Sequence, residues 1–381
     1  MKQITLLNPA RIVFGDGAFA TFTDEFLNQG LQRLFIVSIP PLVELLHKQT
    51  GRLKEAGIEV YLDTRVEQEP DFEMFDRLLE EARQFRADAV AGIGGGSVLD
   101  VAKLLAAFID SDQHVRDTVG IGLLTGRKTW LACLPTTSGT GSEVSPNAIL
   151  LDEQDHLKKG IVSPWLVPDV AYVDPELTWS VPASVTASTG LDALTHCLEA
   201  YTNIFAHPMI DLYALEGIRL ISQGLVPALR NGHDRQARGQ LSLGSLYGGY
   251  CLGPVNTAAV HALSYPLGGM FHIAHGLSNA ILLPHVMEFN LTAAPGRYAE
   301  VARALGADEG TDEKAAARNG IGKIHELIRE CGIPNRLSEL GIPKSALGDM
   351  ADGAIKVTRL LKNNVREVTR EDALALYRKA W

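Results

Sequence analysis

The first 175 residues of the chain alternate short apolar runs with longer amphipathic stretches. Leu34 to Val37 is strand-like, and leucines at helical spacing follow it as far as Gly57. The alternation then repeats in the order strand, helix, strand, helix over residues 58–62, 71–85, 89–93 and 97–109. Parallel strands need a crossover segment between them, and a helix is the usual one. The pattern therefore predicts βαβ units and a mostly parallel sheet.

The rest of the chain, from Ala183 to Trp381, has long helical patterns, few β-branched runs and breaks at Gly or Pro. Thr369 and Asp372 stand three residues apart ahead of an apolar run, which is a capping-box signature for the last helix. The composition shifts near residues 175–185. We therefore predict an α/β domain over residues 1–181 and an all-helical domain over residues 182–381.

Composition narrows the functions that such a chain can have. It has 35 Lys and Arg against 45 Asp and Glu, a formal charge of −10, and no Lys/Arg-rich run, which argues against a nucleic-acid partner. The 4 cysteines form no CxxC pair, so neither a disulfide framework nor a thiolate zinc site is expected. We find no signal-peptide pattern and no apolar stretch of about 18 residues, so we expect a cytoplasmic protein with no membrane partner.

A strand that ends in three glycines is the most informative motif of the first half. Residues 88–103 read DAVAGIGGGSVLDVAK, so a buried strand runs into glycines 94–96 and a helix follows at once. Ser97 and Asp100 have capping-box spacing, which predicts a helix start at the glycines. Backbone N–H groups at a helix N-terminus attract anions, and glycine lets a phosphate approach closely. The spacing differs from the GxGxxG fingerprint, and a tight turn without a ligand is the alternative.

A second loop follows the strand at residues 130–134 and reads PTTSGTGSE over residues 135–143. Its hydroxyl groups and glycines offer hydrogen-bond donors to phosphate, ribose or amide groups. Taken alone, the loop can equally be a solvated surface turn. Two such loops on one sheet indicate a nucleotide that lies across the strand ends.

Residues that can bind a metal are collected in the helical half. Asp192 and His196 lie four residues apart in a helical stretch and so share one face. Of the 11 histidines, four lie between His261 and His285. One carboxylate plus several imidazoles suits a divalent Fe, Zn or Mn ion.

A structural interpretation of these residues stays open at this point. An Asp–His pair at this spacing is often only a helix-face hydrogen bond, and His261, His272 or His275 can each be a core histidine with satisfied hydrogen bonds. His285 follows a proline in an apolar run and looks structural. The collection as a whole favours a metal, because an apolar helical domain rarely gathers so many costly polar groups without partners.

Four motifs stand in a fixed order along the chain. They are GGGSVLDVAK at 94–103, PTTSGTGSEVSP at 135–146, GLDALTHCLEAY at 190–201 and HALSYPLGGMFHIAHGLSNAILLPHV at 261–286. From about Asn8 to the last helix, the chain resembles the iron-containing (group III) alcohol dehydrogenase family. The resemblance implies that residues 1–181 bind NAD or NADP, that residues 182–381 bind Fe(II) or Zn, and that the protein is a homodimer.

The resemblance also implies which residues form the sites. The metal ligands would be Asp192, His196, His261 and His275. The cofactor would contact the two loops and one lysine, through Gly95, Gly96, Ser97, Asp100, Thr136, Thr137, Thr140 and Lys158.

The chain departs from its relatives at positions near the cofactor. Several relatives have an Asp that binds the adenosine ribose where this chain has Ile39, so NAD and NADP both stay open. Several relatives carry a His four residues after the third ligand, where this chain has Tyr265, and many have Asn where it has His272. We hypothesise that His272 or Tyr265 takes over the contact to nicotinamide or the proton relay.

The implied reaction is hydride transfer between NAD(P) and a small alcohol or aldehyde, with the metal as Lewis acid on the substrate oxygen. A rival within the family is a maleylacetate reductase, which reduces a carbon–carbon double bond. A dehydroquinate-synthase-like lyase would need cations for a phosphorylated acid, and the arginines of residues 190–290 lie outside the ligand motifs. A binding module without catalysis would leave the metal site and the two loops unexplained.

Overall fold

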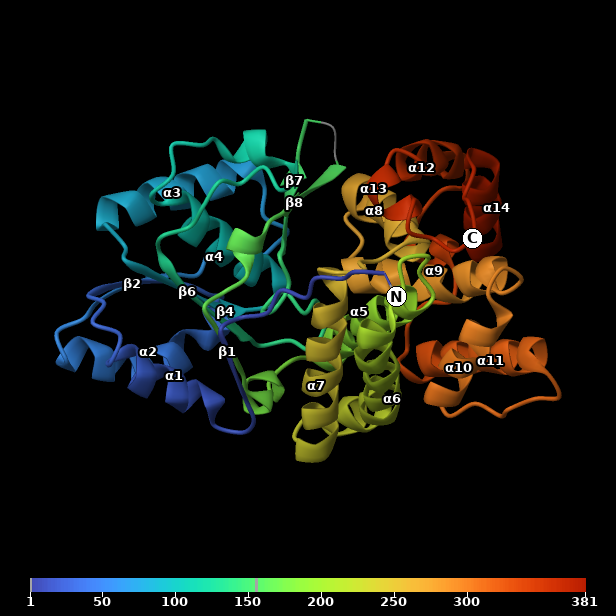
Figure 1. Ribbon diagram of the computed structural model, residues 1–381, viewed down its shortest axis with the longest axis horizontal. Coiled ribbons are helices and arrows are strands. Elements are labelled where there is room, and N and C mark those ends of the chain that lie inside the picture. Colours follow the sequence, from blue (N-terminus) through green and yellow to red (C-terminus); the bar gives the residue numbers. More distant parts are fainter. Residues whose placement is uncertain (1, 155–156) are drawn as a thin grey trace. The chain divides into compact units, whose positions relative to one another are not determined.

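A computed structural model describes residues 2–154 and 157–381 of the chain (Figure 1). The described residues form two compact units. The first, which we call the α/β unit, comprises Leu7–Thr137 and Ser142–Trp179. The second, the helical unit, comprises Ser138–Gly141, Ser180–Trp381 and the N-terminal residues through Leu6. A single domain boundary near residue 181 stays a prediction.

The α/β unit is built on a six-stranded sheet in the order β1-β9-β6-β4-β2-β3. All its strand pairs are parallel, which confirms the prediction from the alternating pattern. The strands are β1 (Arg11–Phe14), β2 (Arg33–Val37), β3 (Glu59–Asp63), β4 (Ala89–Gly94), β6 (Trp130–Pro135) and β9 (Val170–Val173). Every residue of the central strand β4 is buried, which explains its small and apolar sequence AVAGIG.

Helices cover both faces of this sheet. α1 (Ala18–Phe26) and α2 (Val43–Glu55) pack on one face, and α3 (Phe72–Phe85) and α4 (Gly96–Phe108) on the other (Figure 1). α3 shows why the sequence folds in this way, because Asp71 accepts a hydrogen bond from the backbone N–H of Met74 and caps the helix. Five of its apolar residues recur at helical spacing and are buried against the sheet, namely Phe72, Phe75, Leu78, Leu79 and Ala82.

Short elements complete the α/β unit. A three-stranded sheet contains β5 (Gly120–Ile121), β8 (Leu157–Val162) and β7 (Asn147–Asp152) in that order. Four 3₁₀ turns are η1 (Pro40–Leu42), η2 (Val115–Thr118), η3 (Pro164–Leu166) and η4 (Pro175–Thr178).

The helical unit confirms the prediction for the second half of the chain. Its helices are α5 (Ala183–Tyr201), α6 (Pro208–Arg230), α7 (Arg235–Leu252), α8 (Ala259–Phe271), α9 (His275–Asn290), α10 (Pro295–Ala304), α11 (Glu313–Glu330), α12 (Leu347–Ala354), α13 (Thr358–Leu361) and α14 (Arg370–Ala380), with 3₁₀ turns η5 (Leu337–Leu340) and η6 (Lys344–Ala346). The predicted capping box of Thr369 and Asp372 is present at the start of α14.

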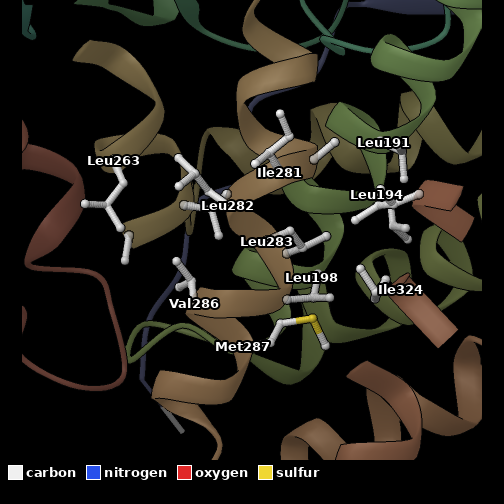
Figure 2. Packing of buried hydrophobic residues seen from close by; sticks show 14 of the residues in the cluster. Leu191, Leu194, Leu198, Leu263, Ile281, Leu282, Leu283, Val286, Met287 and Ile324 are labelled. Carbon is white, nitrogen blue, oxygen red and sulfur yellow. The ribbon is translucent and has the colours of Figure 1, made fainter. Parts of the chain in front are cut away.

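The core of the helical unit forms where α5 and α9 pack together. Leu191, Leu194 and Leu198 of α5 are buried in one apolar cluster with Leu283 and Val286 of α9 (Figure 2). This contact fixes the two helices against each other and leaves the opposite face of α5 for polar residues. Within the part of the chain that the structure describes, no helix is long and apolar enough to span a membrane.

Candidate active site

Three helices contribute the residues that were predicted to hold a metal. Asp192 and His196 lie in α5, His261 lies near the start of α8, and His275 is the first residue of α9. α9 can begin close to α5 because residue 276 is Gly276, where a Cβ would lie 2.1 Å from a backbone carbonyl oxygen of α5. The tight approach of the two helices therefore depends on glycine at this position.

One carboxylate oxygen is the centre of this cluster. Asp192 Oδ1 lies 3.6 Å from His261 Nε2, 3.8 Å from His275 Nε2 and 3.9 Å from His196 Nε2. Ligand atoms of Asp192, His261 and His275 all lie within 4.8 Å of one another. The rings of His196 and His261 stack with 4.8 Å between their centroids. The structure thus brings the four predicted ligands together, and their binding of a metal is proposed below.

Burial and mutual charge set the protonation of these groups. Burial lowers the pKa of His196 to about 4, so this imidazole is neutral near pH 7. Burial alone raises the pKa of Asp192, but the surrounding imidazoles outweigh it and hold that pKa well below its usual range. Burial lowers the pKa of His261, whereas Glu199 and Asp192 raise it, to a net value of about 9. Asp192 is therefore an anion held in place by imidazoles.

The amide of Asn279 stands among these four side chains. Its Nδ2 lies 2.7 Å from Asp192 Oδ1, 3.1 Å from His261 Nε2 and 3.3 Å from His275 Nε2. Its Oδ1 is buried and has no hydrogen-bond partner among the described residues. A buried carboxylate and the lone pairs of several imidazole nitrogens that converge on one point are costly to bury unless protons or a metal cation join them. The donor set therefore fits a divalent cation with nitrogen and oxygen ligands.

Two residues of this site were missed from the sequence. Asn279 lies four residues after His275, and Glu199 lies seven residues after Asp192, so each shares a helix face with a predicted ligand. This periodicity was the available signal. It did not show what the two side chains contact, because their partners come from other helices.

The helix that follows glycines 94–96, which we call the glycine loop, does not have the predicted side-chain cap. α4 begins at Gly96 with Gly95 as its N-cap, and no side chain caps it. The predicted capping box is wrong, because Ser97 lies inside the helix and Asp100 accepts hydrogen bonds from Ser142 Oγ at 2.5 Å and from the Ile149 N–H at 2.9 Å. A glycine cap leaves the first helical N–H groups without a side-chain cap, which suits an anion site.

The two predicted cofactor loops begin side by side in the α/β unit. They follow the neighbouring parallel strands β4 and β6, and the Thr136 N–H donates to the Gly94 carbonyl at 2.9 Å. A Cβ on Gly95 would lie 3.5 Å from Thr137 Oγ1. A Cβ on Gly94 would lie 2.7 Å from Val98, so this glycine is required for the strand to pack on α4. Strand ends of a parallel sheet are where such folds bind nucleotides.

Thr140 is placed differently from Thr136 and Thr137. It lies in the segment 138–141, which belongs to the helical unit. Within that unit the hydroxyl of Ser138 lies 3.1 Å from that of Ser242 in α7. Residues 135–143, which we call the threonine loop, therefore belong partly to the α/β unit and partly to the helical unit.

Two lysines lie near the second loop. Lys158 in β8 is paired with Glu69, and its charge lowers the pKa of Asp100 against the larger effect of burial. Lys103 in α4, which sequence reasoning left without a role, is fully buried and donates to the carbonyl oxygens of Ser142 and Ser145 at 2.9 Å each. Lys103 therefore holds the chain that leaves the threonine loop.

The two residues predicted for nicotinamide contact or proton relay have different surroundings. Tyr265 is 5% exposed, and its ring centroid lies 6.1 Å from that of His275. Its hydroxyl accepts a hydrogen bond from Arg359 at 3.4 Å. His272 is exposed and ends α8 in the left-handed conformation, with φ of 55°. Asn adopts that conformation more readily than His.

Known proteins are similar to this chain in both sequence and fold. The family described as iron-containing alcohol dehydrogenase matches residues 9–175, and its C-terminal family matches residues 186–381. Long-chain-alcohol dehydrogenase 1 of Geobacillus thermodenitrificans is 39% identical over 98% of both chains. A crystal structure of 1,3-propanediol oxidoreductase has a TM-score of 0.95 at 32% identity and covers 100% of both chains. Sulfoacetaldehyde reductase from Bifidobacterium kashiwanohense, solved with NAD+, has a TM-score of 0.87 at 28% identity, covering 100% of this chain and 99% of the other.

Proposed function

Because the chain belongs to the iron-containing alcohol dehydrogenase family, we propose that Asp192, His196, His261 and His275 bind the iron of an oxidoreductase that acts on an alcohol or aldehyde with NAD(P). The convergence of three imidazole nitrogens on one buried carboxylate oxygen carries the proposal. When bound, iron supplies a Lewis acid for the substrate oxygen, and the nicotinamide dinucleotide supplies the hydride donor or acceptor.

The residues of the helical unit have defined tasks in this reaction. Asp192 provides the negative charge that offsets a divalent cation, and the buried His196 presents a neutral nitrogen to it. Asn279 donates to Asp192 and fixes the orientation of its carboxylate. Tyr265, beside His275, and the exposed His272 are the two groups proposed to move the proton.

The α/β unit supplies the dinucleotide site in this proposal. Gly95 and Gly96 present backbone N–H groups at the start of α4 to the pyrophosphate. Ser97, Thr136 and Thr137 add hydroxyl donors at neighbouring strand ends. The remaining contacts are assigned to Asp100, Thr140 and Lys158.

We propose that the enzyme accepts both NAD and NADP. β2 ends at Val37, Ser38 uses its hydroxyl to bind the Ile93 carbonyl at 2.7 Å, and the half-buried Ile39 packs against the cores on both faces of the sheet. No carboxylate at position 39 repels a 2′-phosphate. Ile39→Asp should therefore raise the preference for NAD over NADP, measured as the ratio of kcat/KM values, by about tenfold or more.

A steady-state assay with matched variants tests the proposed metal site. His261→Ala should lose bound iron and alcohol oxidation together, because it removes one ligand from the cluster. His285→Ala is the control, since His285 lies in α9 outside the cluster and pairs with the ring of His325. A His261→Ala protein that keeps iron and full turnover would refute the site. Substrate panels should include alcohols, aldehydes and maleylacetate.

Assembly and location are further proposals. We propose a homodimer in the cytoplasm, with a small alcohol or aldehyde as substrate and no nucleic-acid or membrane partner. Light scattering coupled to size exclusion tests the dimer, and a mass equal to one chain would contradict it. Fractionation of cells tests the location.

A further inference from the structure

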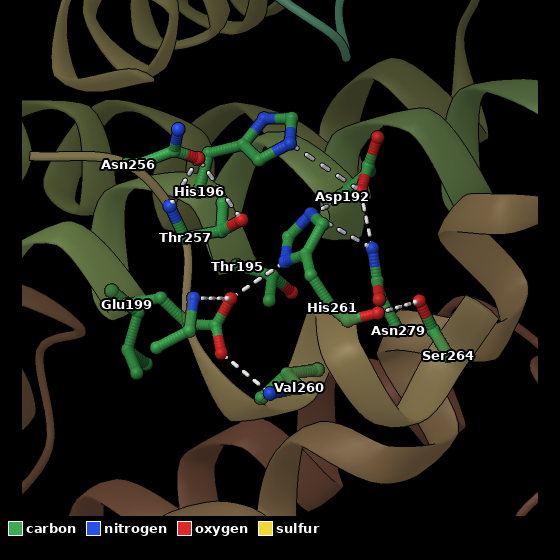
Figure 3. A network of polar contacts seen from close by, with 12 residues as sticks. Asp192, Thr195, His196, Glu199, Asn256, Thr257, Val260, His261, Ser264 and Asn279 are labelled. Carbon is green, nitrogen blue, oxygen red and sulfur yellow. Dashed lines mark hydrogen bonds and ion pairs between the residues drawn. The ribbon is translucent and has the colours of Figure 1, made fainter. Parts of the chain in front are cut away.

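Glu199 continues the polar face of α5 that carries two of the proposed ligands. Asp192, His196 and Glu199 follow at i, i+4 and i+7, and Glu199 is 3% exposed. A buried carboxylate is costly unless donors satisfy it. Figure 3 shows Glu199 on the side of the His261 ring that faces away from Asp192.

The donors that satisfy this carboxylate all come from one short segment. Its Oε2 accepts from the Ala258 N–H at 3.0 Å and lies 2.6 Å from His261 Nδ1, and its Oε1 accepts from the Val260 N–H at 2.5 Å. This segment forms the start of α8. Glu199 therefore holds both the ring of His261 and the backbone from which that ring projects.

The neighbours of the His261 ring define its two nitrogens. The carboxylate of Glu199 accepts two backbone N–H groups, and the Nδ1–H of His261 donates to its Oε2 at 2.6 Å. Nε2 lies 3.1 Å from the amide nitrogen of Asn279, and any proton on it is displaced when a metal binds there. Nε2 is also the nitrogen that faces Asp192. The ring is therefore held in the orientation that a metal ligand at Nε2 needs.

We propose that Glu199 is a positioning residue that sets the metal affinity of the site by orienting His261 and making its Nε2 a stronger donor. A carboxylate behind a ligating histidine has this effect in metal sites in general, and its loss typically lowers metal affinity 10–100-fold. The proposal rests on the proposed metal site. It adds to that site a residue that does not touch the metal, the substrate or the cofactor.

The test is the affinity of the metal-free protein for Zn²⁺, measured by competition with a chelator. Glu199→Gln keeps the size of the side chain but loses its charge and one acceptor, and it should weaken Zn²⁺ binding about 10–100-fold. Glu199→Asp keeps a carboxylate and should recover part of the loss. In ¹⁵N-histidine-labelled protein, the downfield Nδ1–H resonance of His261 should be present in the parent and absent in Glu199→Gln.

Controls separate this role from simple support of the fold. Glu300→Gln changes a carboxylate that accepts from Tyr201 away from the metal cluster, and it should bind Zn²⁺ as the parent does. Zn²⁺ binding by Glu199→Gln at the parent affinity, with or without a lower Tm, would overturn the proposal. If Glu199→Gln does not fold, a parent protein whose spectrum lacks the downfield Nδ1–H resonance of His261 overturns the proposal instead. A parent protein that binds no Zn²⁺ or Fe²⁺ would overturn the proposed function as well.

Discussion

The buried ammonium group of Lys103 offers a sharp test of how the second loop is held. The side chain is 0% exposed and lies in α4, behind the glycine loop. Its Nζ lies within hydrogen-bond distance of the Ser142, Ser145 and Asn147 carbonyls and of Ser142 Oγ, and its three N–H groups are shared among these four oxygens. Burial lowers the pKa of Lys103, and the neighbouring charge of Asp100 raises it in part. The buried ammonium group of Lys103 is thus stabilised by backbone carbonyl groups of the segment 142–147.

Lys103→Met removes the charge and all of these donors while nearly keeping the volume. Hydrogen bonds to charged groups contribute about 1.5–3 kcal/mol each, and losing the lysine also removes the larger of the two cationic charges that favour the ionised form of Asp100. The gain from no longer burying an ammonium group offsets part of the loss. We therefore expect the free energy of unfolding to fall by about 3–5 kcal/mol, with Tm of the full chain lower by roughly 4–6 °C.

Urea denaturation and a thermal melt of the full chain measure this effect. Lys54→Met is the control, because Lys54 is an exposed helical lysine of the same unit. Affinity for NADH should fall in Lys103→Met only, since this variant releases the segment that leaves the threonine loop. A loss of less than about 1 kcal/mol, the size of an ordinary surface substitution, would refute the reasoning.

Three further substitutions test separate features. Burial raises the pKa of Glu143 from 4.5 to about 7, so the folded state binds its proton more tightly than the unfolded chain, and stability should decline by about 3 kcal/mol as pH rises from 4.5 through 7. Glu143→Gln should remove that decline in denaturation curves at pH ~5 and ~8, and an unchanged slope would contradict it. His272→Asn should raise the free energy of unfolding by up to about 1 kcal/mol, because Asn fits a left-handed helix end better, and a destabilised variant would count against this. Tyr265→Phe should lower kcat by about 10²-fold and change its pH profile if Tyr265 moves the proton, and an unchanged profile assigns that task elsewhere.

Local patterns were sufficient to predict most of the fold. α3 follows from a capping aspartate and apolar residues at helical spacing, and β4 from an unbroken run of small apolar residues. In both elements the determining residues are neighbours in the sequence. The two-part organisation of sheet and helices followed from the same signals.

Interactions across long sequence separations were not predictable in this way. Asp100 has capping-box spacing with Ser97, yet it bonds to Ser142 and Ile149, more than forty residues away. Asp100 does not form the capping box with Ser97, because its carboxylate accepts these two hydrogen bonds in the interior instead. Glu199 is similar, since its position on α5 could be predicted but its partners at the start of α8 could not.

The four proposed ligands were assigned from motifs rather than from geometry. Spacing alone placed Asp192 and His196 on one face of a helix, whereas His261 and His275 needed the resemblance to a family. The structure adds what the motifs lacked, namely the amide of Asn279 among the ligands. Three helices must pack before these groups meet.

The most direct test of the account is to measure iron content and alcohol oxidation on the same samples during metal removal and return. The account predicts that chelation abolishes NAD(P)H formation and that a single equivalent of Fe²⁺ per chain restores it. Asp192→Asn should neither hold the iron nor regain activity, because it lacks the charge at the centre of the cluster. Full turnover by the metal-free protein, or by Asp192→Asn without iron, would contradict the central claim.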